Sequence, residues 1–266
     1  MVLIRRFFLL SLLVVACAGA SAAHAAGRVL IATSVELQPA MQQLVADFRR
    51  QSGAPADGTE IVLTLGSSRD LYADIKRGVP IDLFFAANLN YPARVADDGL
   101  AAALPVIYAR NELLLWTLLP GTAPSLDLLA ERRVHVVAIP SKYSSPFGQR
   151  AEQALREAHL WSALQAKLVT GDSVVDVARF VKNGSASAGI VTRSVLHRSE
   201  FAGIGSFSPV PAELYKPISQ AFVLTRHGEA NPVARSFAAF VTSSAAREVF
   251  ERFGYLPPDA ESTAGR

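Results

Sequence analysis

Cysteine is nearly absent from this sequence, since Cys17 is the only one among 266 residues. It lies within an apolar N-terminal stretch that has the features of a removable leader. Without that stretch, the chain would have no disulfide bond, no thiol nucleophile and no thiolate ligand for a metal. The fold of the mature chain must therefore be held by its hydrophobic core alone.

An excess of one charge is also lacking. The sequence has 26 Lys and Arg against 23 Asp and Glu, a formal net charge of +3. Residues 1–25 include two Arg and no acidic residue, so the remainder carries 24 basic and 23 acidic residues, a net charge of +1. Because nucleic-acid-binding chains present a strongly basic surface, this balance argues against nucleic acid as a partner.

The apolar run near the N-terminus is too short to span a bilayer as a mature helix. Arg5 and Arg6 precede an apolar core over Phe7–Ala16, and Ala23-His24-Ala25 matches an A-x-A cleavage site. These features predict a signal peptide over residues 1–25 and a periplasmic location for the mature chain.

An alternative to cleavage by the ordinary signal peptidase is a lipid anchor. The stretch Val14–Cys17 resembles a lipobox, whose last residue would carry the lipid. The well-formed A-x-A site downstream favours cleavage and a mature chain that starts near Ala26.

Charged residues make up only 18% of the chain and apolar residues 50%, which is typical of a globular protein with a large core. The length suits two modest lobes. An apolar strand over Val29–Thr33 precedes a helix whose apolar residues recur at helical spacing, at Met41, Leu44, Val45 and Phe48. Strands and helices alternate in this way along the chain, which predicts an α/β fold with mostly parallel sheets.

A strand, a serine-rich turn and a helix follow one another between residues 60 and 78. The strand covers Glu60–Leu65, and Ser67 and Ser68 stand where the helix begins. Serine at this place is commonly a helix cap. Its hydroxyl can instead face outward beside free N–H groups and bind an anion. The helix ends near Gly78, and the next strand runs over Ile81–Ala86, so the turn lies at the carboxyl edge of a parallel sheet.

Three further turns place small or polar residues just before a helix, at Ser34, at Ser145–Phe147 and at Ser173. One such turn is routine in any α/β protein. Four in one exported chain indicate that several helix N-termini converge on an anion, because each offers unpaired N–H groups and the positive end of a dipole.

Three blocks spread over the mature chain, at Gly66–Phe84, Ala188–Val191 and Glu248–Tyr255, resemble sequences of the periplasmic molybdate-binding proteins of ABC importers. The resemblance implies a two-lobed periplasmic-binding-protein fold, with each lobe a mostly parallel sheet flanked by helices and the ligand in the cleft between them. One lobe would comprise residues 26–103 and 216–266, and the other residues 104–215.

The same resemblance implies a function. The protein would capture molybdate or tungstate by closure of the two lobes and deliver it to an ABC permease in the inner membrane. Such a protein is not an enzyme, works as a monomer, and needs no cofactor and no metal beyond the molybdenum of the bound oxyanion.

The resemblance also implies contacts to the anion from hydroxyl and backbone N–H groups. The family's first ligating serine is replaced by Glu36, so Ser34 or a backbone N–H would take that contact unless Glu36 is protonated. Arg69 could neutralise Glu36 or bind the anion. The ligand-binding residues expected on this basis are Ser34, Glu36, Ser67, Ser68, Arg69, Phe147, Val174 and Thr192.

Other functions stay open at this point. The same scaffold could bind sulfate, an organic acid or a metal complex, and the unusual residues Glu36, Arg69 and Thr192 motivate that alternative. An exported hydrolase is disfavoured because the sequence has no Gly-x-Ser-x-Gly motif and its histidines do not sit beside a candidate acid at a strand end. The effector domain of a transcriptional regulator is disfavoured by the leader and by the lack of a helix-turn-helix segment.

Overall fold

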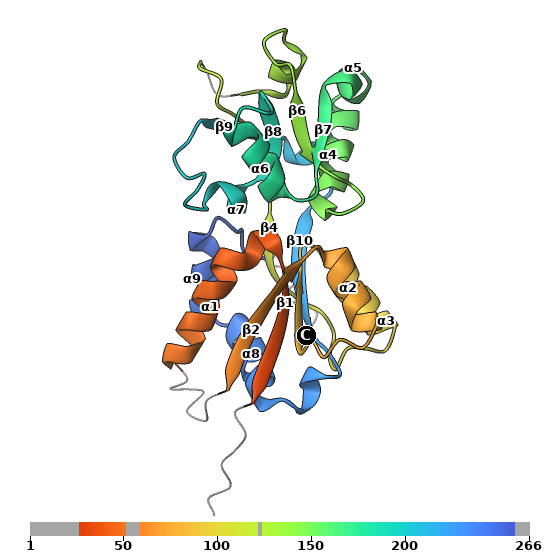
Figure 1. Cartoon of the computed structure of the whole chain (residues 1–266), viewed down its shortest axis with the longest axis vertical. Helices are drawn as coiled ribbons and strands as arrows, with labels where there is room; N and C mark the ends of the chain where they lie inside the picture. The colour runs from red at the N-terminus through yellow and green to blue at the C-terminus, as the bar shows by residue number, and fades with distance from the viewer. Residues whose placement is uncertain (1–26, 52–58, 122–123, 259–266) are drawn as a thin grey trace, which may run out of the picture.

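Two α/β lobes stand one above the other along the long axis of the molecule (Figure 1). The structure is a computed structural model, and it describes residues 27–51, 59–121 and 124–258. The expected signal peptide and Cys17 lie outside these ranges. Each lobe is built on one five-stranded sheet. The expected two-lobed α/β architecture is therefore confirmed.

The first sheet has the strand order β2-β1-β3-β10-β4. These strands cover Glu60–Gly66, Arg28–Ser34, Leu83–Ala86, Ile218–Leu224 and Val106–Asn111 respectively. β1 is parallel to both β2 and β3, whereas β10 is antiparallel to both β3 and β4. Only β10 is therefore reversed, and the sheet is mostly parallel as the sequence predicts.

Helices cover both faces of the first sheet. On one face, α1 (Gln38–Gln51), α8 (Pro232–Val241) and α9 (Ser244–Arg252) share a hydrophobic cluster with β1 and β3. On the other face lie α2 (Ser68–Lys76) and α3 (Asn90–Asp97), which pack on the opposite side of the same strands. The expected apolar stripe of α1 is buried throughout, since Met41, Leu44, Val45 and Phe48 all belong to the core.

The second sheet has the strand order β7-β6-β8-β5-β9. These strands cover Leu168–Gly171, Val137–Pro140, Ala188–Thr192, Leu113–Thr117 and Ser206–Pro209 respectively. β6 is parallel to β7 and β8, while β5 is antiparallel to β8 and β9. This sheet, like the first, has a single reversed strand.

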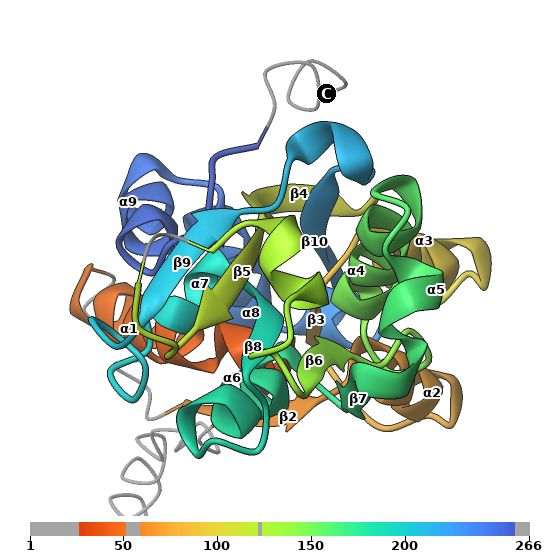
Figure 2. The same cartoon turned by 90° about the horizontal axis from the view of Figure 1, so that it is seen from above.

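Helices also flank the second sheet on both sides (Figure 2). α4 (Pro146–Glu157) and α5 (Trp161–Leu164) lie on one side, and α6 (Val174–Lys182) and α7 (Arg193–Leu196) on the other. Short 3₁₀ turns link several elements, at Val35–Leu37 (η1), Leu126–Ala130 (η2), Gln165–Lys167 (η3), Ala212–Leu214 (η4) and Gly228–Ala230 (η5).

The chain crosses between the lobes twice, from β4 to β5 and from β9 to β10. β4 pairs with β10 in the first sheet, although its residues 106–111 fall inside the range 104–215 expected for the second lobe. An apolar extended segment fits either sheet, so sequence alone could not assign it. Its partner β10 lies more than a hundred residues further along the chain.

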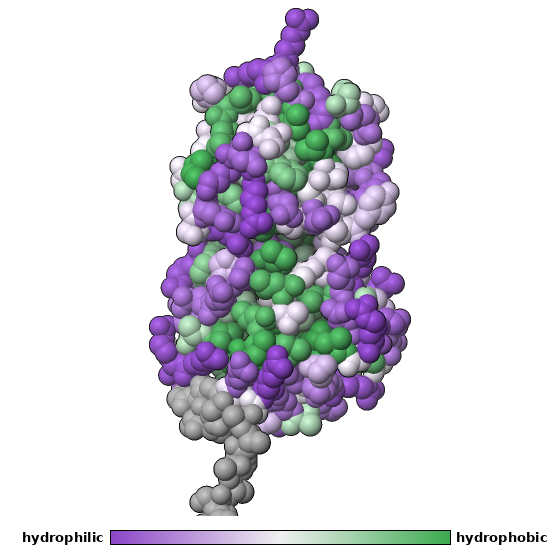
Figure 3. Space-filling model, in the orientation of Figure 1, coloured by the Kyte–Doolittle hydropathy of each residue, from purple (hydrophilic) through white to green (hydrophobic). Residues whose placement is uncertain are grey.

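Hydrophobic side chains gather over β2, between the hydrophilic surfaces of α1 and α2 (Figure 3). β2 is an edge strand of the first sheet, which leaves Leu65 partly exposed. Within the described ranges, no helix is both long and apolar enough to cross a membrane.

A glycine allows α4 to begin tightly against the end of β6. A Cβ atom on Gly148 would overlap the carbonyl oxygen of Pro140 and the backbone of Ser141. Both contacts are backbone atoms, so no side-chain rotation can relieve the overlap. The start of α4 would have to move away from the sheet.

We therefore expect Gly148→Ala to lower the free energy of unfolding by about 1–3 kcal/mol, as overpacking of a close contact generally does. Chemical denaturation measures this directly. Gln149→Ala, at the next and exposed position of α4, is the matched control and should change stability by no more than about 0.5 kcal/mol. Equal losses of stability in Gly148→Ala and Gln149→Ala would contradict the close packing of Gly148 against the end of β6.

Candidate ligand-binding site

A polar pocket of about 400 Å³ opens between the two lobes. The first lobe contributes the ends of three strands, with Ser34 closing β1, Gly66 closing β2 and Ala87 following β3. The second lobe contributes the turns before α4 and α6. The pocket therefore lies at the carboxyl edge of both sheets, where open α/β sheets bind their ligands.

Six of the eight residues expected at the site line this pocket: Ser34, Glu36, Ser67, Ser68, Arg69 and Val174. Phe147 and Thr192 do not line it. The ring of Phe147 belongs to the core of the second lobe, so only its backbone N–H, in the first turn of α4, is a donor near the cleft.

Thr192 is fully buried at the end of β8. Its hydroxyl lies 3.1 Å from that of Ser194, which also accepts a hydrogen bond from Asn111 at 2.7 Å. These contacts hold the crossover strand β4 against the second lobe. In this structure Thr192 therefore belongs to the connection between the lobes and not to the pocket wall.

Ser68 is the serine of the first lobe with a hydroxyl proton available to a ligand. Its side chain is buried, and its oxygen accepts a hydrogen bond from the backbone N–H of Ala87 at 2.9 Å. That bond uses the oxygen as an acceptor and leaves the O–H group to donate. The backbone N–H of Ser68 is also one of the unpaired donors at the start of α2.

Ser67, in contrast, is an ordinary helix cap. Its hydroxyl oxygen accepts from the backbone N–H of Asp70 at 3.1 Å and donates to the carboxylate of the same residue at 2.8 Å. The hydroxyl proton of Ser67 is thus already paired within the first lobe. Of the two neighbouring serines, Ser68 is the stronger candidate to bind an anion.

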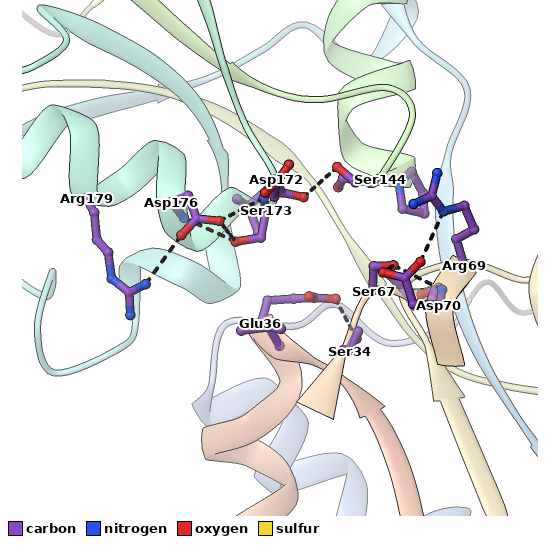
Figure 4. Close-up of a pocket in the computed structure, with 17 residues that line it drawn as sticks. Ser34, Glu36, Ser67, Arg69, Asp70, Ser144, Asp172, Ser173, Asp176 and Arg179 are labelled. Carbon is purple, nitrogen blue, oxygen red and sulfur yellow. Dashed lines mark hydrogen bonds and ion pairs between the residues drawn. The ribbon is translucent and has the colours of Figure 1, made fainter. Parts of the chain in front are cut away.

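The second lobe adds polar groups that the expected site set does not include, among them Ser144, Ser145, Asp172, Ser173, Asp176 and Arg179 (Figure 4). Ser173 forms a reciprocal capping box with Asp176 at the start of α6. Ser144 donates to the backbone oxygen of Asp172 at 2.8 Å. In the sequence, the serines before Pro146 and Val174 had already indicated that the turns before α4 and α6 could bind an anion.

Glu36 lies on the floor of the pocket, although only 6% of the residue is exposed. Its Oε1 atom accepts a hydrogen bond from the Ser34 hydroxyl at 2.7 Å and a longer one from the Gln220 amide at 3.4 Å. The Tyr255 hydroxyl donates to the backbone oxygen of Glu36 at 3.2 Å. The side chain lines the cleft and is held by residues of β1 and β10, while the segment after α9 holds the backbone of Glu36.

Burial raises the pKa of the Glu36 carboxyl above its ordinary value near 4.5. The hydrogen bond from Ser34, the backbone of Glu36 and the charge of Arg198 oppose this rise but do not cancel it. No basic nitrogen of the described residues lies within 4.0 Å of the carboxylate. Glu36 is thus a buried acid without an ion-pair partner, which favours its neutral form.

Arg69 does not neutralise Glu36 in this structure. It pairs with Asp70 at 3.2 Å, and both side chains are largely exposed at the rim of the pocket. Arg179 on the opposite rim pairs with Asp176 at 3.4 Å. Both cations at the pocket are therefore already paired with an aspartate of their own lobe.

The pocket contains the groups that a small anion requires, and it holds no cluster of metal ligands. Free first-turn N–H groups of α2, α4 and α6 and the Ser68 hydroxyl supply hydrogen-bond donors. Among the described residues, no group of three or more His, Cys, Asp or Glu is arranged to hold a metal ion.

Two α/β lobes joined by two crossovers, with a polar pocket between them, define the periplasmic-binding-protein fold. Proteins of this class hold small solutes between their lobes. Residues 29–256 match the family of bacterial extracellular solute-binding proteins, and the chain belongs to that family.

The chain is similar to molybdate-binding proteins over most of its length. It is 29% identical over 253 residues to the molybdate-binding protein ModA of Azotobacter vinelandii, covering 93% of this chain and 98% of that protein. ModA of Rhodobacter capsulatus is 28% identical over 233 residues, with 87% and 89% covered. The solved structure of the Azotobacter vinelandii periplasmic molybdate-binding protein matches with a TM-score of 0.78 and 26% identity, covering 87% of this chain and all of that one.

The raised pKa of Glu36 leads to a prediction about stability. A folded state that binds the proton more tightly than the unfolded state is favoured in acid, and the contribution is complete below the unfolded pKa near 4.5. It declines as the pH rises through the folded pKa. Glutamine does not titrate. As the pH rises between the unfolded and the folded pKa of Glu36, Glu36→Gln should therefore gain stability relative to the parent chain, by up to about 1.4 kcal/mol per pH unit.

Urea denaturation at several pH values measures this difference. Glu213→Gln, at an exposed position of η4, is the matched control and should follow the parent chain at every pH. If the stability difference between Glu36→Gln and the parent chain is the same at every pH, the raised pKa of Glu36 is contradicted.

Proposed function

We propose that this protein is the periplasmic solute-binding component of an ABC importer, and that its ligand is molybdate or tungstate. The similarity to molybdate-binding proteins along nearly the whole chain supports this choice of ligand. The single structural observation that carries the proposal is Ser68, a buried hydroxyl with a free proton, next to the unpaired N–H groups that open α2.

In this proposal the anion is held by hydrogen bonds and not by a countercharge. The first lobe contributes the hydroxyl and N–H of Ser68, and the second lobe contributes the first-turn N–H groups of Phe147 and Val174. A dianion has no proton to donate, so a pocket rich in donors selects it by hydrogen bonding. Ser34, Ser67, Arg69 and Thr192 are not direct ligands in this arrangement.

Capture requires the lobes to close. A pocket of about 400 Å³ has room for about a dozen water molecules, several times more than a small oxyanion needs. Rotation of the lobes about the two crossovers would bring the N-termini of α4 and α6 toward Ser68 and expel that water. The closed form would then be delivered to the permease in the inner membrane.

The remaining parts of the proposal concern the export, oligomeric state and activity of the protein. We infer cleavage of the leader after residue 25 and release into the periplasm, with the lipid anchor at Cys17 as the alternative. The protein would act as a monomer, with no catalytic activity and no cofactor. We place the first lobe boundary at Glu112, between β4 and β5, in place of the expected boundary near residue 104, and we keep the second boundary near residue 216.

A second candidate is a different anion on the same scaffold. Its support is Glu36. An ionised carboxylate would repel a dianion by about 8 kcal/mol at a separation of about 4 Å and an effective dielectric constant of about 20, which is twice the value for two unit charges. Sulfate and small organic acids are the ligands to compare. The neutral form of Glu36 removes this objection to molybdate.

The test of the proposed function is a calorimetric and thermal-shift titration of the mature chain with molybdate, tungstate, sulfate and phosphate. Molybdate and tungstate should bind at one site per chain, and about 2.7 kcal/mol of added stability is expected at a hundredfold excess over the dissociation constant. A response to sulfate alone would favour the second candidate. No response to any of the four anions would overturn the proposal.

Ser68→Ala should weaken molybdate binding about tenfold or more, since it removes a donor to a charged ligand and leaves the Ala87 N–H unpaired. Ser208→Ala, the same change in β9 outside the pocket lining, should leave the dissociation constant unaltered. Calorimetry compares the two variants with the parent chain. An unchanged affinity of Ser68→Ala would remove Ser68 from the binding site.

A further inference from the structure

The pocket combines donors for an anion with a carboxyl group that faces the same space. Figure 4 shows the Glu36 side chain extending from η1 toward the centre of the cleft, where its carboxyl group meets Ser34. An ionised Glu36 would oppose an anion held by Ser68 and by the N-termini of α4 and α6. The same carboxyl in its neutral form would add one more hydrogen-bond donor.

No charge around Glu36 is free to hold it in its ionised form. Arg198, whose positive charge lowers the pKa of Glu36, pairs with Glu200 at 3.2 Å and donates to the backbone oxygen of Val35 at 3.5 Å. Its guanidinium is thus already engaged by an acid of its own segment. The local charge balance near Glu36 is close to zero without any contribution from its carboxyl group.

The other elements packed against Glu36 offer no countercharge either. α6 presents Asp176 and Arg179, which pair with each other. Two buried tyrosines, Tyr108 of β4 and Tyr255 after α9, have pKa values raised by burial and stay neutral. Arg193 of α7 is paired with Glu112 at the crossover.

The hydrogen bonds to the Glu36 side chain leave one of its two carboxyl oxygens unused. Both side-chain hydrogen bonds to Glu36 fall on Oε1, so Oε2 is the oxygen that can carry a proton. The adjacent Gln220 is fully buried, and its Oε1 atom has no hydrogen-bond partner among the described residues. Neither hydrogen bond to Glu36 uses Oε2, so a proton on that oxygen can be donated to a ligand in the pocket.

We propose that Glu36 binds the oxyanion in its protonated form, with the carboxyl O–H donating a hydrogen bond to an anion oxygen, so that capture of the anion is coupled to one proton. The proton comes from solvent when the free chain is ionised and stays on Glu36 in the complex. This inference rests on the proposed function, because it requires an anionic ligand. It makes Glu36 a determinant of both affinity and its pH dependence.

Linkage gives the expected magnitude. While the free chain keeps Glu36 ionised, each rise of one pH unit should weaken binding about tenfold, and binding should be independent of pH where the free chain is already protonated. The amide of Glu36→Gln donates without titrating, so this variant should bind with an affinity that does not change with pH. Glu36→Ala removes the donor altogether and should bind more weakly than Glu36→Gln at every pH.

The experiment is calorimetric titration with sodium molybdate from about pH 6 to about pH 8.5, repeated in two buffers of different ionisation enthalpy to count protons. The number of protons that the parent chain takes up per anion should lie between zero and one and should not fall as the pH rises, and Glu36→Gln should take up none. Glu213→Gln is the matched control and should behave as the parent chain does.

The outcomes separate this inference from the function on which it rests. If Glu36→Gln and Glu36→Ala bind molybdate equally well at every pH, the side chain supplies no donor to the anion, and the role of Glu36 is overturned while the proposed function stands. Tighter binding by Glu36→Ala than by Glu36→Gln would show that the side chain only obstructs the anion, and would also overturn the inference. No binding of any tested anion overturns both.

Discussion

The direction of the strands is the constraint on which the site depends. In each sheet one strand alone is reversed, so the carboxyl ends of the others meet at a single edge. The helices that follow β2, β6 and β7 begin at that edge and direct their unpaired N–H groups into the same cleft. The chain can therefore present donors from both lobes without one basic residue in direct contact with a ligand.

Few of the hydroxyl groups in the cleft have a proton to spare. Ser34 donates to Glu36, Ser67 to Asp70 and Ser173 to Asp176, so each of these serines is tied to an acid of its own lobe. Ser68 differs because its oxygen accepts from a backbone N–H and no acid among the described residues takes its proton. The cleft thus has fewer hydroxyl groups that can donate to an anion than it has serines. The hydrogen-bond partners of each serine decide which hydroxyl groups remain available.

Glu36 is subject to two physical requirements that act in the same direction. A buried carboxyl without a countercharge favours the neutral form, and an anion site also favours the neutral form of any acid that lines it. Both requirements are met when the acid keeps its proton. The same residue that makes the cleft look unsuitable for a dianion in the sequence then becomes one of its donors.

The sequence by itself determined the α/β class, the amphipathic α1 and the serine turns at helix starts, because periodicity and helix capping are local properties. A resemblance carried by whole blocks of sequence supplied the two-lobed arrangement. The tertiary structure alone decided that β4 pairs with β10, that Thr192 packs at the crossover, and that Glu36 is buried without an ion-pair partner among the described residues. These outcomes depend on residues far apart in the chain, and such contacts leave no periodic signal in a single sequence.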